Sequence, residues 1–473
     1  MLEILSHSSH FLPFLSPKRR REIGKTQLSF FDFSPHFQIS LSIEADFRKY
    51  LLSLMCKRSK ESDMDNLMRK LPIGIQTFED IRRKNYLYVD KTALVWRMAN
   101  LGKPYFLSRP RRFGKSLLLS TFESYFLGKK ELFEGLAIEQ METEWTEYPV
   151  LHLDLNAEKY DKPEKLNDIL SNHLTQWELQ YGKGLDEKTP SARFGGVIRR
   201  ACEQTGHQVV VLVDEYDKPL LQAITNLELL EEYRQSLKAF YGVLKSTDRY
   251  LRFVFLTGVT KFSQVSVFSD LNQLNDISLD YSYATLCGIT REELIATFKP
   301  EIETFGRKNH QTPEEVVTAM ERNYDGYHFH PDGDGVFNPF SVLNAFSKLE
   351  LGNYWFQTGT PTFLIELLQK SDYDLRTLLN GIEAPVSSFA EYRVDANNPI
   401  PLIYQSGYLT IKDYDREFQN YLLAFPNDEV RYGFINFLVP FYTPMKNNDQ
   451  GFYIGKFIQE LRTGDYEAFL TRL

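Results

Sequence analysis

A Gly-Lys-Ser triplet at 114–116 joins an apolar run at 105–109 to a segment whose Leu, Phe and Tyr residues recur with helical spacing. The first turn of a helix carries unpaired N–H groups and the positive end of the helix dipole, so it attracts phosphate. In the nucleotide-binding pattern G-x-x-x-x-G-K-[ST], the lysine reaches the β and γ phosphates and the hydroxyl binds Mg²⁺. Arg109 stands where the first glycine of that pattern belongs. The stretch therefore predicts either a phosphate-binding loop with an unusual entrance or an ordinary strand-to-helix turn.

A second apolar run, VVVLVDE at 209–215, ends in two adjacent carboxylates. Ligands gather at the carboxyl ends of strands in open α/β sheets. Asp214 is predicted to hold Mg²⁺ together with Ser116, and Glu215 to orient and deprotonate the attacking water as the catalytic base. Two acids after a strand can also begin an exposed turn. The upstream triplet, in which Lys115 is predicted to be catalytic, favours the metal and base roles.

Apolar runs separated by helical stretches predict a parallel sheet flanked by helices. The predicted strands occupy 105–109, 149–156, 209–215 and 252–258. Each is continuous rather than strictly alternating in apolar and polar residues, as buried parallel strands tend to be. The strand at 149–156 lies in the chain between the two nucleotide motifs, and an inserted strand with an Asp-Glu pair is typical of additional-strand P-loop ATPases. A polar residue at the end of a further strand touches the γ-phosphate in those ATPases. Thr257 is therefore a predicted catalytic residue, with a hydrogen-bonded threonine at a strand end as the alternative.

From about residue 290 the strand pattern gives way to helical stretches that begin with Thr, Asn or Ser beside Pro, which is N-cap chemistry. Near the end, 407–415 and 420–428 predict a hairpin, followed by a helix from Asp428 with Asn427 as its cap. Helices followed by a hairpin and a helix indicate a winged-helix module.

A loop at 323–335 contains two histidines and two aspartates, namely His328, His330, Asp332 and Asp334. A structural zinc site would need nearby cysteines or a second ligand pair, and this loop has neither. An aromatic-anchored turn is the favoured interpretation.

Together these patterns predict an α/β fold, a P-loop NTPase with a parallel sheet of the additional-strand type, followed by a mainly helical, winged-helix-like C-terminal region. The predicted segments are a poorly ordered extension at 1–69, a P-loop ATPase domain at 70–289, a helical region at 290–440 and a truncated segment at 441–473. The net charge of −8 gives no overall basic field for nucleic acid, and the three scattered cysteines suggest a reducing compartment. No apolar run approaches the ~20 residues of a membrane helix. We therefore expect a cytoplasmic protein that does not span a membrane.

Six stretches resemble, in the same order, the AAA-ATPase-like family of bacteria. They are LPIGIQTFEDIRRKNYLYVDKT, FLSRPRRFGKSLLLSTFESYF, VLVDEYDKPL, LTGVTKFSQVSVFSDLNQLNDISL, YDGYHF and VFNPFSVLNAF. In that family the Arg-rich entrance of the loop is normal, so the resemblance implies an intact site for ATP and Mg²⁺.

Position by position, the resemblance implies nucleotide contacts by Arg111, Arg112, Gly114, Lys115 and Ser116, with metal and water chemistry at Asp214 and Glu215. It also places YLYVDKT at 86–92 close to the nucleotide base. Members of the family commonly continue into a PD-(D/E)XK nuclease-like domain, which needs an Asp and a Glu-x-Lys on adjacent strands. No convincing pair of this kind stands between 381 and 473, so nuclease activity is not expected.

The expected function is that of a Mg²⁺-dependent ATPase whose ATP binding and hydrolysis drive a conformational change. The alternative is a nucleotide-binding switch with little or no hydrolysis. A DNA or protein client and a homo-oligomeric assembly are compatible with either function.

Overall fold

The computed structural model describes residues 69–102, 104–261, 273–358, 381–390 and 398–442, with single positions between 364 and 378 and between 456 and 468. The extension predicted at 1–69 and the segment predicted at 441–473 lie almost wholly outside the described residues. Arg69–Leu473 forms one structural unit.

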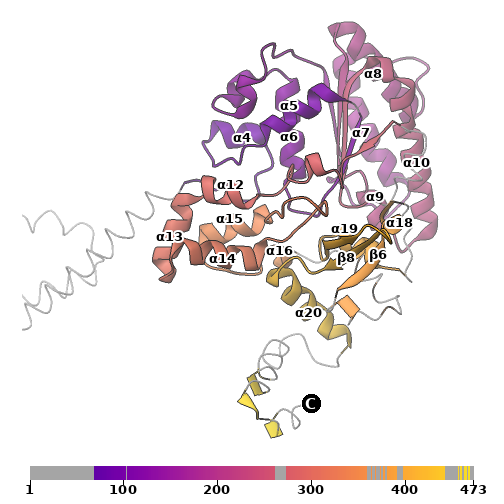
Figure 1. Ribbon diagram of the computed structural model, residues 1–473. Coiled ribbons are helices and arrows are strands. Elements are labelled where there is room, and N and C mark those ends of the chain that lie inside the picture. Colours follow the sequence, from indigo (N-terminus) through magenta and orange to yellow (C-terminus); the bar gives the residue numbers. More distant parts are fainter. Residues whose placement is uncertain are drawn as a thin grey trace, which may run out of the picture. The chain divides into compact units, whose positions relative to one another are not determined.

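Five parallel strands form the central sheet of this unit (Figure 1). They are β1 (Tyr105–Ser108), β2 (Val150–Asp154), β3 (Val209–Asp214), β4 (Leu251–Gly258) and β5 (Asn275–Asp276). Every residue of β1 and β3 is buried, which explains why their sequences are apolar up to the final Ser108 and Asp214. The four predicted strands are thus confirmed, whereas the polar two-residue strand β5 carried no apolar signal.

The strand order is β2-β3-β4-β1-β5, so β4 lies between the strand before the Gly-Lys-Ser triplet and the strand that ends in Asp214. The sequence assigned the inserted position to the strand at 149–156, and this is wrong in space, because β2 pairs only with the outer side of β3. Position along the chain does not fix position in a sheet. The pairs Ser108↔Gly258 and Asp154↔Asp214 bring neighbouring strand ends level, so the polar residues that follow them gather at one edge.

Helices cover both faces of the sheet. The structure contains α4 (Phe78–Arg83), α5 (Thr92–Leu101), α6 (Lys115–Phe126), η3 (Lys130–Phe133), η4 (Ala137–Gln140), α7 (Glu164–Tyr181), α8 (Pro190–Thr205), α9 (Lys218–Gln222), α10 (Leu227–Ser246), η5 (Asp248–Tyr250) and η6 (Tyr281–Tyr283). Figure 1 shows α4, α5 and α6 on one side of the sheet and α7, α8 and α10 on the other. Helix α6 begins within the Gly-Lys-Ser triplet, at Lys115. It packs its Phe122 and Phe126 against Phe253 of β4, which fixes the start of the helix beside the strand ends.

We call residues 290–442 the C-terminal module. Its elements are α12 (Arg291–Thr297), α13 (Lys299–Asn309), α14 (Pro313–Tyr324), α15 (Pro339–Lys348), α16 (Tyr354–Gln357), β6 (Ile382–Pro385), α18 (Ser387–Ala390), α19 (Ile400–Gln405), β7 (Thr410–Asp415), β8 (Asn420–Ala424) and α20 (Asp428–Tyr442). Thr290 and Thr312 form capping boxes, and Asn427 accepts from the N–H of Val430 at 3.1 Å, so the predicted caps are confirmed. The predicted hairpin is β7-β8, to which β6 adds a third strand. The winged-helix assignment stays a prediction.

The hydrophobic core runs across the boundary predicted at 289/290. The cluster around the sheet includes Trp355 and Tyr408 from the C-terminal module. A second cluster, formed by α12 to α15, includes Leu87 from the segment before α5. An ion pair of 2.6 Å between Lys91 and Glu293 adds to this contact. The C-terminal module therefore packs directly on the elements that carry the Gly-Lys-Ser triplet.

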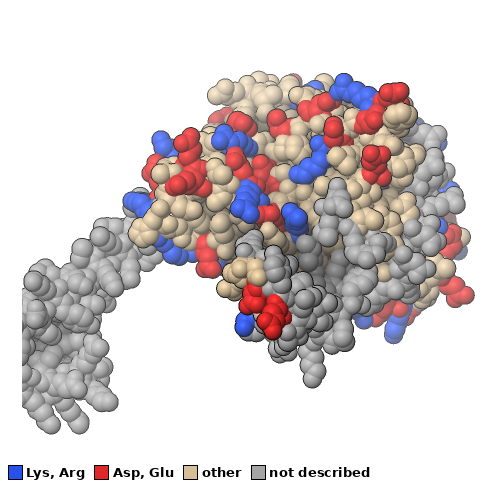
Figure 2. All heavy atoms as spheres, turned by 60° about the horizontal axis from the view of Figure 1, so that its bottom comes forward, with Lys and Arg blue, Asp and Glu red and all other residues tan. Residues whose placement is uncertain are grey.

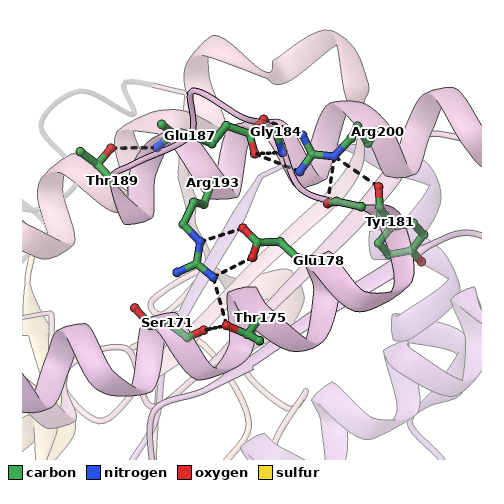
Figure 3. A network of polar contacts seen from close by, with 11 residues as sticks. Ser171, Thr175, Glu178, Tyr181, Gly184, Glu187, Thr189, Arg193 and Arg200 are labelled. Carbon is green, nitrogen blue, oxygen red and sulfur yellow. Dashed lines mark hydrogen bonds and ion pairs between the residues drawn. The ribbon is translucent and has the colours of Figure 1, made fainter.

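Two arginine–glutamate pairs tie α8 to α7 and to the connection between them (Figure 3). Arg193 donates from Nε and Nη2 to the two carboxylate oxygens of Glu178 at 2.7 and 2.8 Å, and Nη2 also donates to Thr175. Arg200 pairs with Glu187 at 2.5 Å. The side chains of Arg193 and Glu178 are only 12% and 6% exposed, so solvent screens this bidentate pair little.

Arg193→Met is expected to lower the free energy of unfolding by about 3 kcal/mol, because the Glu178 carboxylate stays buried without its counter-charge. Hydrogen bonds from Arg193 lower the pKa of Glu178. The pair therefore stabilises the fold above the ordinary glutamate pKa of ~4.3, and this stability is lost as the pH falls through the lowered pKa. Urea unfolding of the full chain, near neutral pH and in acid, measures both effects. Arg83→Met removes an exposed pair and serves as control; an equal loss in both variants would contradict the burial argument.

Candidate functional site

A cleft of about 1130 Å³, open solvent included, lies at the carboxyl ends of the strands beside the start of α6. Six of the predicted site residues line it: Arg111, Arg112, Gly114, Lys115, Ser116 and Glu215. The segment before α4, the start of α15 and Asn156 form the other walls. Asn156 follows β2 and was missed by sequence reasoning, because a lone polar residue after a strand carries no motif. The structure thus brings the triplet and the carboxylate end of β3 to one cleft.

The loop between β1 and α6 has an unusual backbone. Gly114 has a φ of +89° with nothing near the position of a Cβ, so glycine is needed there for its conformation and not for space. Arg112 also lies in the left-handed region, with a φ of +68°. The Nζ of Lys115 donates to the carbonyls of Arg109 and Pro110 at 3.0 and 3.2 Å. The lysine side chain thus lies against the loop, and both of its hydrogen-bond acceptors are uncharged backbone carbonyls.

Arg109 occupies the position of the first glycine in the nucleotide-binding pattern, and its buried side chain supports the loop through hydrogen bonds. Its side chain is 1% exposed and donates from Nη1 to the carbonyl of Ser278 at 2.7 Å and from Nη2 to that of Tyr283 at 3.1 Å. Its guanidinium lies 3.9 Å from the ring centroid of Phe329. Arg109 therefore supports the loop and does not line the cleft.

The next two arginines of the loop stack on aromatic residues of the C-terminal module. The guanidinium of Arg111 lies 5.2 Å from the Trp355 ring, whose indole N–H donates to the Arg111 carbonyl at 3.1 Å. The guanidinium of Arg112 lies 4.9 Å from the Phe340 ring. Sequence reasoning missed Trp355 and Phe340, because no local pattern relates residues so far apart in the chain.

The YDGYHF stretch packs against the same loop. Phe113 meets the rings of Tyr327 and Phe329 edge-on, at centroid distances of 4.8 and 5.6 Å. His328 lies between these two rings in the sequence, and its Nδ1 is 3.1 Å from the carbonyl of Gly333 in the turn that follows. The aromatic residues of this stretch therefore anchor the turn on the loop.

The carboxylates after β3 are held by the end of β4. Thr257 is fully buried and donates its hydroxyl to Asp214 at 2.9 Å, so its contact with a γ-phosphate stays a prediction. Glu215 has a φ of +50°, and burial raises the pKa of its carboxyl, opposed by the nearby charge of Lys115. Asp217 accepts from the backbone N–H and the hydroxyl of Thr260 at 2.6 and 2.7 Å, which locks the turn.

The two side chains predicted to hold a magnesium ion, Ser116 and Asp214, both carry oxygen atoms. Within the described ranges, no group of three or more His, Cys, Asp or Glu side chains is placed to hold a metal. Mg²⁺ requires less, since one or two protein oxygen ligands combine with water and substrate phosphates. Ser116 lines the cleft and carries a hydroxyl, whereas Asp214 carries a carboxylate at the end of β3 and, like Thr257, is not among the residues that line the cleft.

An apolar pocket adjoins the cleft and shares Gly114, Leu117 and Pro339 with it. Tyr88 and Val89, from the YLYVDKT stretch, line this pocket. The residues that line this pocket are mostly apolar.

Glu429, in the first turn of α20, is a buried carboxylate behind these contacts. It accepts from the backbone N–H of Trp355 and from the hydroxyl of Ser341, both at 2.7 Å. Burial raises its pKa to about 7. The raised value means that the fold favours the protonated form.

Glu429→Gln is expected to flatten the dependence of stability on pH between about 4.3 and about 7. In the natural chain the contribution of the neutral group is complete below the unfolded pKa and is lost as the pH rises through the folded pKa. This loss amounts to about 4 kcal/mol. Urea unfolding across the pH range measures the slope. The exposed Glu383→Gln is the control, and an unchanged slope in Glu429→Gln would refute the assignment.

The family described as "Predicted AAA-ATPase" (AAA-ATPase-like) matches residues 72–268. A protein of Azotobacter chroococcum mcd 1, described as an uncharacterized protein in the vnfD 5′ region, is 40% identical over 380 residues, which are 80% of this chain and 71% of that protein. The ORC2 protein of Aeropyrum pernix, solved in ADPNP and ADP complexes, is 12% identical, with 74% of this chain and 94% of that chain covered and a TM-score of 0.26. A score this low does not establish a shared fold. Of the helices that the structure describes, none has the length and hydropathy to cross a membrane.

Proposed function

Because this chain belongs to the AAA-ATPase-like family, we propose that its P-loop module is a Mg²⁺-dependent ATPase that couples ATP binding and hydrolysis to movement of the C-terminal module. The observation that carries the proposal is the single cleft shared by Lys115, Ser116 and Glu215, with Asp214 next to Glu215. A phosphate-binding cation, oxygen ligands for a metal and a candidate base lie at one edge of the sheet, as phosphoryl transfer requires.

Each side chain has a proposed role at the phosphates. Lys115 exchanges the two loop carbonyls for β and γ phosphate oxygens, which are stronger acceptors because they are charged. Ser116 and Asp214 would hold Mg²⁺, which would supply positive charge to neutralise the phosphates. Glu215 takes a proton from the attacking water, and the burial that raises its pKa makes it a stronger base. Thr257 holds Asp214 in place and is the proposed sensor of the γ-phosphate.

The nucleotide base is proposed to enter the apolar pocket beside the cleft. This pocket is continuous with the phosphate end through Gly114 and Leu117, and Tyr88 lies in its wall. The proposal agrees with the placement of YLYVDKT that the family resemblance implied.

Phosphate release by the full chain tests the proposed activity. We expect release from ATP that requires Mg²⁺ and stops when EDTA is added. Tight ATP binding without release would exclude an ATPase and leave the nucleotide-dependent switch. The switch has one observation in its favour, since the stacking of Arg111 and Arg112 on the C-terminal module gives binding alone a route to move that module.

The proposed setting is the cytoplasm, with a DNA or protein client and assembly into a homo-oligomer as further proposals. Acidic and basic side chains are interspersed over the face shown in Figure 2. Such a surface does not favour DNA over protein. Adding duplex DNA to the phosphate-release assay separates the two, because a DNA client should raise the rate and a protein client leaves it unchanged.

A further inference from the structure

Arg111 carries a charge that the side chains and carbonyls around it satisfy poorly. Its Nε and Nη2 are shielded from solvent and have no hydrogen-bond acceptor among the described residues. The same two nitrogens of Arg193 bind both oxygens of a carboxylate elsewhere in the chain. Burial lowers the pKa of Arg111, which reflects the cost of a charge without a partner. Since Arg111 also lines the cleft, an anion that enters there would supply the missing partner.

The present partner of Arg111 is Trp355, which is fully buried. An aromatic face attracts a guanidinium more weakly than a charged oxygen pair does. The two N–H groups are shielded from solvent, so the side chain has to shift to reach an anion in the cleft. A shift of this kind ends the stack on Trp355.

One carboxylate connects the two stacking contacts of the loop. Glu429 accepts from the backbone N–H of Trp355 and from the hydroxyl of Ser341. Ser341 directly follows Phe340, on which Arg112 stacks. Tyr408 packs on Trp355 at 5.2 Å and on Phe434 of α20 at 5.1 Å between ring centroids. A displacement at Trp355 is therefore passed to α20 by a hydrogen bond and by packed rings.

We propose that bound phosphate and the Trp355 ring compete for the guanidinium of Arg111. The C-terminal module then senses a nucleotide through the loss of the stack between Arg111 and Trp355. The inference rests on the ATP site proposed above. It makes Trp355 a regulatory residue that opposes nucleotide binding, and it predicts the direction of the effect when the ring is removed.

Calorimetric titration with Mg-AMP-PNP, a nonhydrolysable ATP analogue, tests the competition in the full chain. Trp355→Leu removes the stack and is expected to bind roughly three- to tenfold more tightly than the natural chain. Trp177→Leu, the same truncation on α7 and away from the residues that line the cleft, is the matched control and should bind as the natural chain does. Unchanged or weaker binding by Trp355→Leu would overturn the proposal.

Tryptophan emission gives a second measurement that does not depend on Trp355→Leu being folded. Pyrophosphate and Mg-AMP-PNP should change the emission of the natural chain, adenosine should not, and the change should vanish in Trp355→Phe, which keeps a ring. The same change with adenosine, or its persistence in Trp355→Phe, would contradict the competition. A natural chain that binds no Mg-AMP-PNP would instead refute the proposed ATP site, so the two failures are distinguishable.

Discussion

Glu215→Gln is expected to lower the rate of ATP hydrolysis at least a hundredfold while ATP still binds. The amide has nearly the shape of the carboxylate but cannot accept the proton of the attacking water, and general-base catalysis contributes roughly 10²- to 10⁴-fold. Glu215 lines the cleft next to Asp214, and its raised pKa makes the natural rate fall as the pH decreases through that pKa. Phosphate release under saturating ATP measures the rate, and calorimetric titration measures the affinity.

The control for this prediction is Glu228→Gln, an exposed glutamate in the first turn of α10. Its rate and affinity should match those of the natural chain. If Glu215→Gln retained more than about a tenth of the rate, the base would have to be another group.

Lys115→Ala is expected to weaken ATP binding by at least about tenfold, since a charge-assisted hydrogen bond to phosphate is worth roughly 1.5–3 kcal/mol. The substitution leaves the helix start and its N–H groups in place, so adenosine, which has no phosphate, should bind equally well to both proteins. The natural lysine already has two hydrogen bonds within the loop, and exchanging them reduces the net gain. Calorimetric titration with ATP measures the expected loss of affinity, and titration with adenosine measures the affinity that should not change.

Lys130→Ala is the matched control, because Lys130 is exposed and lies beyond the end of α6. An equal loss of ATP affinity in both variants would mean that the effect is general charge attraction. A loss of adenosine affinity in Lys115→Ala would mean that the variant has altered the fold of the site.

The strands of the sheet and the start of α6 could be predicted from the sequence, because buried strand positions are occupied by apolar residues. The six residues of β3 are all buried, and nothing but apolar side chains stands there until Asp214. Asn427 could be recognised as a cap for a different reason: the hydrogen bond that it accepts comes from Val430, only three residues away.

The contacts between distant parts of the chain could not be predicted in this way. The place of β4 between β1 and β3 depends on which strands pair in space. The internal role of Arg109 depends on Ser278 and Tyr283, and that of Trp355 depends on a loop 244 positions earlier in the chain. Contacts between residues so far apart in the chain follow no fixed sequence spacing. A sequence pattern therefore shows that a loop is rich in arginine but not which residues each arginine contacts.

The indole of Trp355 contacts a residue that precedes it by 244 positions, which has a consequence for how the protein is made on the ribosome. At roughly 5–20 residues per second, synthesis from the loop to its aromatic support takes about 10 to 50 seconds. During this time the strands around the loop have been made, but Arg111 and Arg112 still lack the rings that cover them. The nascent chain thus exposes an arginine-rich turn that is free to meet polyanions, nucleotides among them, before the rest of the molecule arrives to compete for it.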